Sequence, residues 1–487
     1  MPKCILPIAM ILLTAATAAA ESDPQVVLAD MLAGGDAEAA WVALRATEDS
    51  DLQPMLEALS RSPSSARRRF ALAALAEILE DRAADFLAEH AFGDEDRGVR
   101  LEAAARLLWL DGVSDEIIER ALASEDREVR SMAVDTMVRR GRGFAVADQL
   151  RTLAACDHAP TACSARLNLL SLGHRDQLVA LEQTIADAAS PQPLLMRICA
   201  QVGEDELTTA GEMVLRLAES DRPVELRLQA WRAVSKVVPG AASLLGEAIA
   251  SADSTVLRVN LLAILGDTDQ PRSALETLAR NEDSVTATLA AFDLARLAGG
   301  PQAATAAAAA VALEHPVVVE YVLDRAETDV QDRGPAAEFY IPAMRKVIAQ
   351  ADPRASRMAA QHVRAARAAT LLADIGSGEA ADTLRELLAQ RYSPVVRAVG
   401  AGLVRSNTPL ARELARPLLN SPYEELATDA ALVLGRAGDS AARDKLHQFI
   451  APGGRYPAPL RAMSAWYLLK IAGRTDPAAR QLAEQVN

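Results

Sequence analysis

The sequence is poor in aromatic residues. Only 3% of its 487 residues are Phe, Trp or Tyr, although half of them are apolar. An apolar fraction carried by small and aliphatic side chains suits closely packed helices, whereas β-sheets are enriched in aromatic and β-branched residues. The composition therefore favours an all-α fold over a β-sandwich.

Residues that commonly carry catalysis are also scarce. The chain has four Cys and six His, and the six His are scattered along it. It contains no H-E-x-x-H, no G-x-S-x-G and no glycine-rich loop that could hold a phosphate. The 66 acidic residues are interpreted as helix caps and solvated faces. We therefore expect no catalytic residues, no metal site and no cofactor, and we predict that the protein is not an enzyme.

Long apolar runs are missing beyond the N-terminus, and a membrane-spanning helix needs roughly 20 apolar residues. The N-terminus itself has Lys3, an apolar run over residues 4–16 and small residues at 18–20, directly before Glu21. This is the pattern of a cleaved signal peptide. We predict that residues 1–20 are removed and that the mature protein is periplasmic or secreted, without a membrane span.

Basic residues are also fewer than acidic ones. The sequence has 51 Lys and Arg against 66 Asp and Glu, a formal net charge of −15. Such a surface repels phosphate backbones, and no cluster of Lys and Arg with interleaved aromatic residues offsets it. A nucleic-acid partner is therefore not expected.

An internal repeat dominates the rest of the chain. With Arg130 of the stretch EVRSMA as the reference, thirteen similar helix starts align, ten of their twelve intervals being 30–34 residues and the others 36 and 45. Apolar residues return three, four and seven positions later, as in an amphipathic helix. The reference positions are Arg67, Arg100, Arg130, Arg166, Arg197, Arg227, Arg258, Thr288, Val319, Arg364, Arg397, Ala427 and Arg461.

Glycine and proline follow the same period. Gly recurs where each of these helices should end, as at Gly112 and Gly141, because it accepts the left-handed conformation of a C-cap. Pro often precedes the next first helix, as at Pro223, where the first helical amide has no partner to lose. We therefore predict two helices per repeat, the second one being clearest in residues 266–280 and 376–390.

The pattern D-x-x-V-R-x-x-A, carried by Asp96, Val99, Arg100 and Ala103 and again by residues 126–133, resembles the short bacterial form of the HEAT repeat. Asp96 and Arg100 are also spaced to form an i,i+4 ion pair. The likeness covers residues 62–487. It implies an α-solenoid of about thirteen stacked two-helix repeats in a curved superhelix, because one helix pair cannot bury its apolar face alone.

Two further segments complete the predicted organisation. Residues 21–61, with helix-like runs at 26–32 and 52–59, are predicted to form an N-terminal helical cap. The interval of 45 residues predicts an insertion near residues 325–360.

The family resemblance also bears on function. HEAT-repeat proteins are mostly scaffolds and adaptors, which implies an exported, non-enzymatic scaffold that binds a protein or peptide on its curved helical surface. The phycobilin lyases are an enzymatic minority, so a lyase-like enzyme or cofactor chaperone is one alternative. A structural component of a cell-envelope assembly is another.

The stretch CDHAPTAC (156–163) is the one compact cluster of reactive residues. It could hold a metal with two Cys and one His, or it could form a disulfide. Export favours the disulfide between Cys156 and Cys163, because oxidising compartments promote pairing and zinc would need a fourth ligand. Cys199 lies on an apolar helix face and is expected to be a buried free thiol, with pairing to another cysteine or to a partner as the alternative.

Tyrosines gather in the C-terminal third. Tyr392, Tyr423 and Tyr456 recur at the same turn, at intervals of 31 and 33 residues, which would place them along one edge of a solenoid. They could bind a partner, or they could pack as local staples beside the neighbouring prolines, and the packing role is favoured.

Two irregular segments interrupt the repeats, the insertion at 325–346 and the loop at 451–460. Insertions in repeat proteins often contact partners, but long surface loops also cost little and can be neutral. The predicted partner-binding residues are Tyr392, Tyr423, Tyr456, Phe339, Tyr340 and Arg455.

Overall fold

The computed structural model describes residue 28 and residues 50–351, 359–391, 393–451 and 456–475. Within these residues the chain consists of α-helices and short 3-10 turns, and none of them forms a strand. The predicted all-α fold is confirmed. The signal peptide at 1–20, the helix-like run at 26–32, Tyr392 and Arg455 lie outside the described residues.

Each of the thirteen reference positions lies in a helix of its own, and we call these the marked helices. They are α5 (Ser65–Leu79), α7 (Arg97–Trp109), α9 (Arg127–Arg139), α11 (Ala159–Ser171), α13 (Gln192–Glu204), α15 (Val224–Val237), α17 (Thr255–Gly266), α19 (Ser284–Ala298), α21 (Pro316–Arg333), α23 (Ala360–Ile375), α25 (Pro394–Arg405), α27 (Glu424–Arg436) and α29 (Ala458–Ile471). The period of the sequence is therefore also the period of the structure.

Within the described residues, a second helix follows each marked helix from α5 to α27. These helices are α6 (Ala84–Gly93), α8 (Asp115–Leu122), α10 (Ala147–Ala154), α12 (Leu178–Ala186), α14 (Gly211–Ala218), α16 (Ala241–Ser251), α18 (Arg272–Leu278), α20 (Pro301–Val311), α22 (Ile341–Ala349), α24 (Gly378–Leu388), α26 (Pro409–Ala415) and α28 (Arg443–Ile450). Helix α4 (Gln53–Leu59) precedes the first marked helix and matches the predicted run at 52–59.

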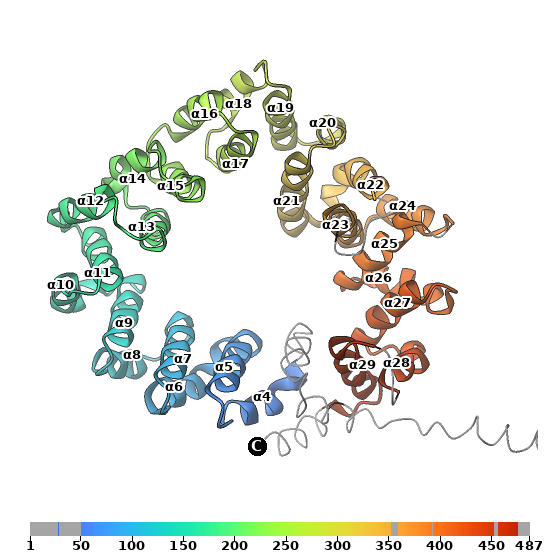
Figure 1. Cartoon of the computed structure of the whole chain (residues 1–487), viewed down its shortest axis with the longest axis horizontal. Helices are drawn as coiled ribbons and strands as arrows, with labels where there is room; N and C mark the ends of the chain where they lie inside the picture. The colour runs from blue at the N-terminus through green and yellow to red at the C-terminus, as the bar shows by residue number, and fades with distance from the viewer. Residues whose placement is uncertain (1–27, 29–49, 352–358, 392, 452–455, 476–487) are drawn as a thin grey trace, which may run out of the picture. The chain divides into compact units, whose positions relative to one another are not determined.

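The contacts divide the chain into two compact units. Unit 1 combines residues 1–80 with 400–487, and unit 2 holds residues 81–399. In unit 2 each marked helix from α7 to α17 packs on the next marked helix, and α16 packs on α18. Figure 1 shows the marked helices α7 to α17 on the inner side of the curve of unit 2 and the second helices α6 to α18 on the outer side, and we call these the inner and outer layers.

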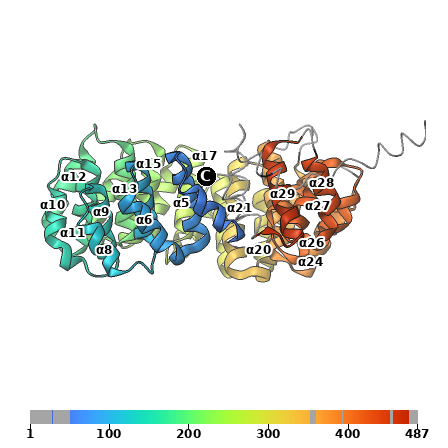
Figure 2. The same cartoon turned by 90° about the horizontal axis from the view of Figure 1, so that it is seen from below.

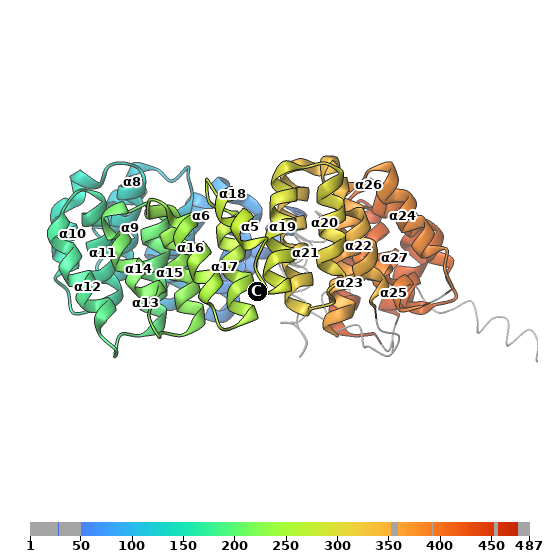
Figure 3. The same cartoon turned by 90° about the horizontal axis from the view of Figure 1, so that it is seen from above.

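The helices of unit 2 stand side by side, so their connecting turns gather along the two edges of the stack (Figures 2 and 3). In unit 1, helices α27, α28 and α29 pack together, and α4 packs on α5. The Thr475 hydroxyl donates to Asp51 Oδ2 at 2.5 Å, which joins the two sequence segments of this unit. The predicted boundary between a cap and the repeats at residue 62 is not tested by this division.

The arginines at the reference positions hold successive helices together by an unexpected contact. Arg100 Nη1 donates to the carbonyls of Asp94 and Glu95, at 2.8 and 3.0 Å, where the preceding helix α6 has ended. Arg130 repeats the contact one unit later with the carbonyls of residues 124 and 125. These arginines therefore satisfy carbonyl groups that a helix end leaves without partners.

The predicted ion pair between Asp96 and Arg100 is replaced by other contacts. Asp96 caps the N-terminus of α7 by accepting from the Val99 amide at 3.0 Å. The ion pair that links neighbouring repeats joins Arg97 to Asp126, at 2.8 Å. The correction has a simple cause, since an aspartate at an N-cap turns its carboxylate toward the free amides of the first turn.

The insertion near residues 325–360 is largely helical where the structure describes it. Helix α21 runs on to Arg333, and the 3-10 turn η6 (Gly334–Tyr340) then leads directly into α22. Residues 352–358 lie outside the described residues. The extra length therefore enters the stack itself instead of forming one projecting loop.

A polar ladder crosses three neighbouring helices of the inner layer. Asp135 of α9 accepts from Asn168 Nδ2 of α11 at 2.5 Å, and Asn168 Oδ1 accepts from Gln201 Nε2 of α13 at 3.0 Å. Burial raises the pKa of Asp135 to about 6, although Arg197 opposes the shift. The folded protein therefore holds the proton of this carboxyl more tightly than the unfolded chain does.

The pH dependence of stability should report this carboxyl. Because its native pKa lies above the unfolded value of about 3.9, its favourable contribution is complete near pH 4 and is lost as the pH rises through about 6. Asp135→Asn keeps an acceptor for Asn168 and cannot ionise, so it should exceed wild type by about 1–2 kcal/mol at pH 7 but not at pH 4. Urea unfolding at both values measures the difference. The exposed Asp148→Asn is the control, and an equal response in both variants would contradict the assignment.

Candidate functional site

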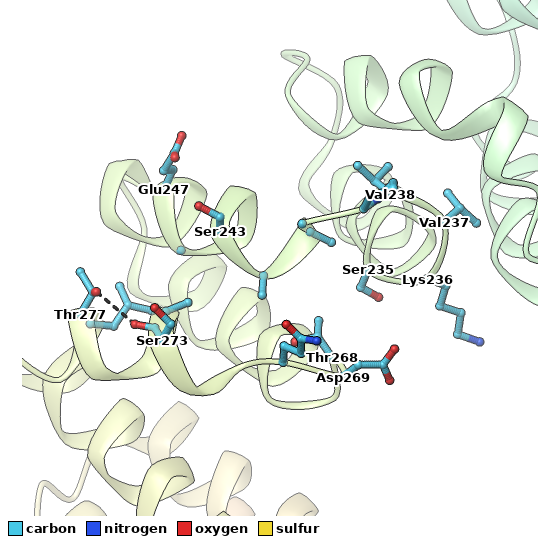
Figure 4. Close-up of a pocket in the computed structure, with 18 of the residues that line it drawn as sticks. Ser235, Lys236, Val237, Val238, Ser243, Glu247, Thr268, Asp269, Ser273 and Thr277 are labelled. Atoms are coloured by element: carbon cyan, nitrogen blue, oxygen red, sulfur yellow. Dashed lines mark hydrogen bonds between the residues drawn. The ribbon is translucent and has the colours of Figure 1, made fainter.

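A cleft lies in the outer layer beside helix α16. Its volume is about 830 Å³, and it is bounded by the end of α15, by α16, by the turn after α17 and by α18. Figure 4 shows Ser243 and Glu247 on α16, Ser273 and Thr277 on α18, and Ser235 on α15. We call this the α16 cleft.

Small residues bring α16 and α18 close together along the cleft. A Cβ atom on Gly246 of α16 would lie 3.4 Å from the Ala274 Cβ of α18, which is ordinary contact. Gly240 precedes α16 with a φ of 75°, a left-handed conformation that glycine adopts without strain. The chain can therefore turn sharply from α15 into α16, and small residues such as Gly246 and Ala274 line the cleft between α16 and α18.

Hydroxyl groups supply most of the polar lining. Ser235 donates to the Arg232 carbonyl at 2.8 Å, Thr268 to Leu265 at 2.7 Å, and Thr277 to Ser273 at 3.1 Å. Because their protons are used within their own segments, these oxygens are left as acceptors. The cleft is thus suited to N–H donors on a ligand.

A second hollow of about 600 Å³ lies on the other side of α16, against α14, α15 and α17. Trp231 lines it and is 2% exposed, and Arg227 donates through Nε to the Ala218 carbonyl at 3.3 Å. Glu247 lines both hollows. A smaller hollow of about 230 Å³ lies between α12 and α14. Hollows therefore lie along the helices from α12 to α18, and the two larger of these three flank α16.

The predicted disulfide is not formed in the structure. Cys156, Cys163 and Cys199 are free thiols. Helix α11 begins between the first two at Ala159, so Cys163 lies one turn inside a helix and is buried, whereas the Cys156 sulfur lies 3.7 Å from the His158 carbonyl oxygen. The pairing stays a prediction for protein taken from an oxidising compartment.

Cys199 lies in α13 and is fully buried, as expected from its apolar helix face. Burial raises the pKa of its thiol to about 12, so it stays protonated and is a poor nucleophile. Among the described residues, no three side chains of His, Cys, Asp or Glu gather closely enough to hold a metal ion.

The two tyrosines of the predicted edge that the structure describes differ in environment. Tyr423 is 43% exposed at the N-cap of α27. Tyr456 donates to Glu424 Oε1 at 2.6 Å, and its ring meets Phe449 edge-on at a centroid distance of 4.9 Å. Tyr456 thus has the contacts of a staple between neighbouring repeats, whereas Tyr423 keeps a surface that a partner could cover.

Single alanine variants should separate the two tyrosines. Tyr456→Ala should cost about 1–2 kcal/mol, because it removes an edge-on aromatic pair and a hydrogen bond. Tyr423→Ala should change stability by less than about 0.5 kcal/mol, as expected for an exposed position. Thermal unfolding of both variants tests this, and equal losses would remove the distinction.

The two aromatic residues of the insertion are packed inward. Tyr340 is fully buried, so its predicted role in partner binding is wrong. Its hydroxyl donates to Asp329 Oδ2 at 2.8 Å, and Phe339 is half-buried with its ring centroid 4.4 Å from that of Tyr340. The turn η6 folds back onto α21, and this contact draws the ring of Tyr340 into the core.

Tyr340 belongs to a buried ionic network that joins α19, α21 and η6. Arg296 of α19 bridges Asp293 and Asp329, with both N–O distances at 3.2 Å. The Tyr321 hydroxyl donates to Asp293 Oδ2. Burial raises the pKa of Asp293, and Arg325 and Arg296 oppose that shift.

Arg325 extends the network past α19 to the end of α17. Its Nη2 donates to the Ala263 carbonyl at 2.6 Å, and its Nη1 pairs with Asp267. Three consecutive marked helices are thereby tied together by charged side chains. None of the three hollows described above is lined by residues of this network, so we assign it a structural role.

The fold and the grooves define the chain as a helical-repeat solenoid. None of the described helices is both long and apolar enough to cross a membrane.

No protein-family model matches the chain, and no curated protein matches it. Among solved structures, UNC-45 from Drosophila melanogaster is 14% identical over 95% of this chain and 77% of that chain, with a TM-score of 0.29. A second structure, of an UNC-45 chaperone that binds and folds muscle myosin, is 12% identical over 98% of this chain and 68% of its own, with a TM-score of 0.31. An engineered protein is 17% identical over 90% and 98%, with a TM-score of 0.20. Scores this low carry no argument, so the solenoid assignment depends on the helices of this chain.

Proposed function

We propose that the protein is an exported, non-enzymatic scaffold of the HEAT-like type that holds a segment of another polypeptide in the α16 cleft. The observation that carries the proposal is the lining of this cleft. Hydroxyl oxygens and small residues line a volume of about 830 Å³ between two packed helices. That volume lies within the range of about 300–1,000 Å³ that ligand sites occupy.

The chemistry of the lining favours a peptide main chain as the ligand. The hydroxyl oxygens of Ser235, Thr268 and Thr277 can accept from backbone N–H groups, and the small residues of α16 let a backbone approach closely. Few charged side chains line the cleft, namely Lys236, Glu247 and Asp269. A small charged metabolite would therefore find little to pair with, whereas an uncharged extended segment would find acceptors along its length.

The position of the other hollows supports a ligand longer than the cleft. The hollow lined by Trp231 flanks the same helix, and a further hollow lies between α12 and α14. A polypeptide that passes over α16 could thus contact several outer helices. Each contact would add affinity without any single deep pocket.

Filling the cleft should test this directly. Ser273→Trp places a large ring on α18 inside the cleft, and we expect it to weaken capture of the native partner at least about tenfold. Thr305→Trp makes the same change on the exposed face of α20 and is the matched control. The partner is first identified by crosslinking and pull-down from the native host. Unchanged capture by Ser273→Trp, at an unchanged melting temperature, would refute the cleft as the binding site.

Export is part of the proposal because of the N-terminal pattern. If residues 1–20 are a signal peptide, N-terminal sequencing of natively expressed protein should begin at or near Glu21, and the protein should be found in the periplasm or the medium. An intact Met1 on cytosolic protein would contradict export. It would also remove the main reason to expect the Cys156–Cys163 disulfide.

A further inference from the structure

Polar groups gather in the second hollow, on the other side of α16 from the cleft. Its lining includes Arg227 and Trp231 of α15, Glu219 at the end of α14, Glu247 of α16 and Asp253 before α17. We call this site of about 600 Å³ the Trp231 hollow. It combines an aromatic donor, one cation and three carboxylates.

Trp231 brings a hydrogen-bond donor to the hollow. The residue is 2% exposed, and its indole N–H has no hydrogen-bond acceptor among the described residues. The indole nitrogen is nevertheless not sealed in the core, so it reaches the open space of the hollow that Trp231 lines. Because a buried N–H group is costly to leave unpaired, a ligand that accepts from it gains affinity.

Arg227 brings further donors. It occupies the reference position of its repeat, where Arg100 and Arg130 each donate to two carbonyl groups after the preceding helix. Arg227 donates through Nε to the Ala218 carbonyl, at 3.3 Å. Its two Nη groups have no hydrogen-bond partner in the described part of the chain, so they can donate to a ligand.

The carboxylates of the hollow have no bound cation. Glu219, Glu247 and Asp253 are exposed, and none of them forms an ion pair with another described residue. Their three negative charges against the one positive charge of Arg227 leave the lining with a formal charge of −2. A cationic group that enters the hollow is therefore attracted.

The charged residues around the hollow do not offset this charge. Arg222 donates to three backbone carbonyls around the end of α12, and Arg258 pairs with Asp283 at 3.2 Å. Asp221 and Glu225, which flank Arg222 in the sequence, are acidic. The surroundings therefore add negative charge, not positive charge.

We propose that the Trp231 hollow binds a lysine or arginine residue of the polypeptide segment that the α16 cleft holds. The cationic end of this residue pairs with the carboxylates, and its main-chain carbonyl accepts from the N–H groups of Trp231 and Arg227. Glu247 lines both sites, so a segment that crosses α16 reaches the hollow from the cleft. The inference rests on the proposed function, because it assigns one residue of the same bound segment.

The two kinds of polar group in the lining together select this occupant. A metal ion would pair with the carboxylates but could not accept from the N–H groups. An anion such as phosphate would accept from the N–H groups but would be repelled by the carboxylates. A basic residue within a polypeptide carries both a cation and a carbonyl acceptor.

Nuclear magnetic resonance of the whole chain observes the hollow through the indole N–H of Trp231. The probe is the peptide Ala-Lys-Ala, blocked at both ends, and two comparison peptides carry norleucine or Glu in place of Lys. We expect a saturable shift of the Trp231 resonance with the Lys peptide, with at least about tenfold higher affinity than for either comparison peptide. Binding should weaken as salt is added. Trp231→Phe identifies the resonance, and the anisotropy of a labelled peptide measures the affinity without any variant.

Paired variants locate the cation. Glu219→Gln combined with Asp253→Asn removes two carboxylates of the hollow and should weaken binding of the Lys peptide at least about tenfold, without changing that of the norleucine peptide. Asp332→Asn combined with Glu379→Gln removes two exposed carboxylates on α21 and α24. This matched control changes the net charge equally and should leave the affinity unchanged.

Three outcomes would overturn the inference. They are no saturable shift with the Lys peptide, equal affinity for the Lys and norleucine peptides, and equal effects of the two paired variants.

The cleft variant separates this inference from the proposed function. Ser273 does not line the Trp231 hollow, so Ser273→Trp should bind the Lys peptide normally. Failure of the Lys peptide, together with weaker partner capture by Ser273→Trp, would reject the hollow and retain the cleft. Normal binding of the Lys peptide, together with unchanged partner capture by Ser273→Trp, would reject the cleft and retain the hollow as a site for a basic residue.

Discussion

Replacing Asp293 by alanine should lower the free energy of unfolding by about 3–5 kcal/mol, as when one partner of a buried ion pair is removed. Asp293 is fully buried, pairs with Arg296 at 3.2 Å and accepts from the Tyr321 hydroxyl. Its loss leaves Arg296 with only Asp329 and leaves a buried hydroxyl without its acceptor. The cost arises from these stranded groups more than from the lost attraction itself.

Urea unfolding followed by circular dichroism measures the effect, and hydrogen exchange shows where it acts. Because repeat stacks can unfold in parts, we expect the amides of α19 and α21 to lose most protection. Asp332→Ala on the exposed side of α21 is the matched control and should change stability by less than about 0.5 kcal/mol. A loss below about 1 kcal/mol for Asp293→Ala would show that the network contributes little.

Gly266→Ala should lower the free energy of unfolding by about 2–3 kcal/mol. A Cβ atom at this position would lie 2.5 Å from Arg325 Nη2 and 3.2 Å from Asp293 Oδ2. A guanidinium group can usually move aside, but this one is held by the Ala263 carbonyl and by Asp267. The methyl group would therefore break those contacts, although alanine favours a helix more than glycine does.

A double variant isolates the cause. If the clash with Arg325 is responsible, Gly266→Ala should cost much less in an Arg325→Ala background, so that the two losses are strongly non-additive. Gly378→Ala, in the first turn of α24 with open space around its Cβ position, is the control for glycine replacement alone. Additive losses would place the effect of Gly266→Ala elsewhere.

The repeat architecture could be predicted because it depends on local sequence features. The apolar spacing after each reference position, Gly at helix ends and Pro at helix starts all depend on residues within one helix pair, and each reference position has its own helix. Contacts between repeats were harder to predict. The spacing of Asp96 and Arg100 predicts an ion pair, but Arg100 donates to the carbonyl groups that follow the preceding helix.

The α16 cleft could not be found from the sequence, because it is made by residues with small side chains and ordinary chemistry. The low charge of α16, whose one charged residue is Glu247, gives no distinct signal, because α12 also carries one charged residue and α20 carries none. The buried network gives a clearer one. Asp293 directly follows Phe292 in a predicted helix, and both residues are buried. A charged residue is seldom buried without an oppositely charged or hydrogen-bonding partner, so such a position indicates a partner in the core.

Tyr340 shows why the sequence does not reveal that the insertion packs inward. The sequence around Tyr340 is typical of an irregular surface segment. The ring of Tyr340 lies inward because α21 and η6 place Asp329 within hydrogen-bonding distance of its hydroxyl. That contact depends on the tertiary packing of α19 against α21, which no local pattern records.

Site-specific photo-crosslinking in the native host tests the central claim, that the α16 cleft holds a polypeptide. A photoreactive residue at Ser243 on α16 should give a discrete adduct with one polypeptide, and mass spectrometry should place the crosslink on a single extended segment of it. The same residue at Thr305 on the exposed face of α20 should give no such adduct. The absence of an adduct from Ser243, or the same adducts from both positions, would contradict the account.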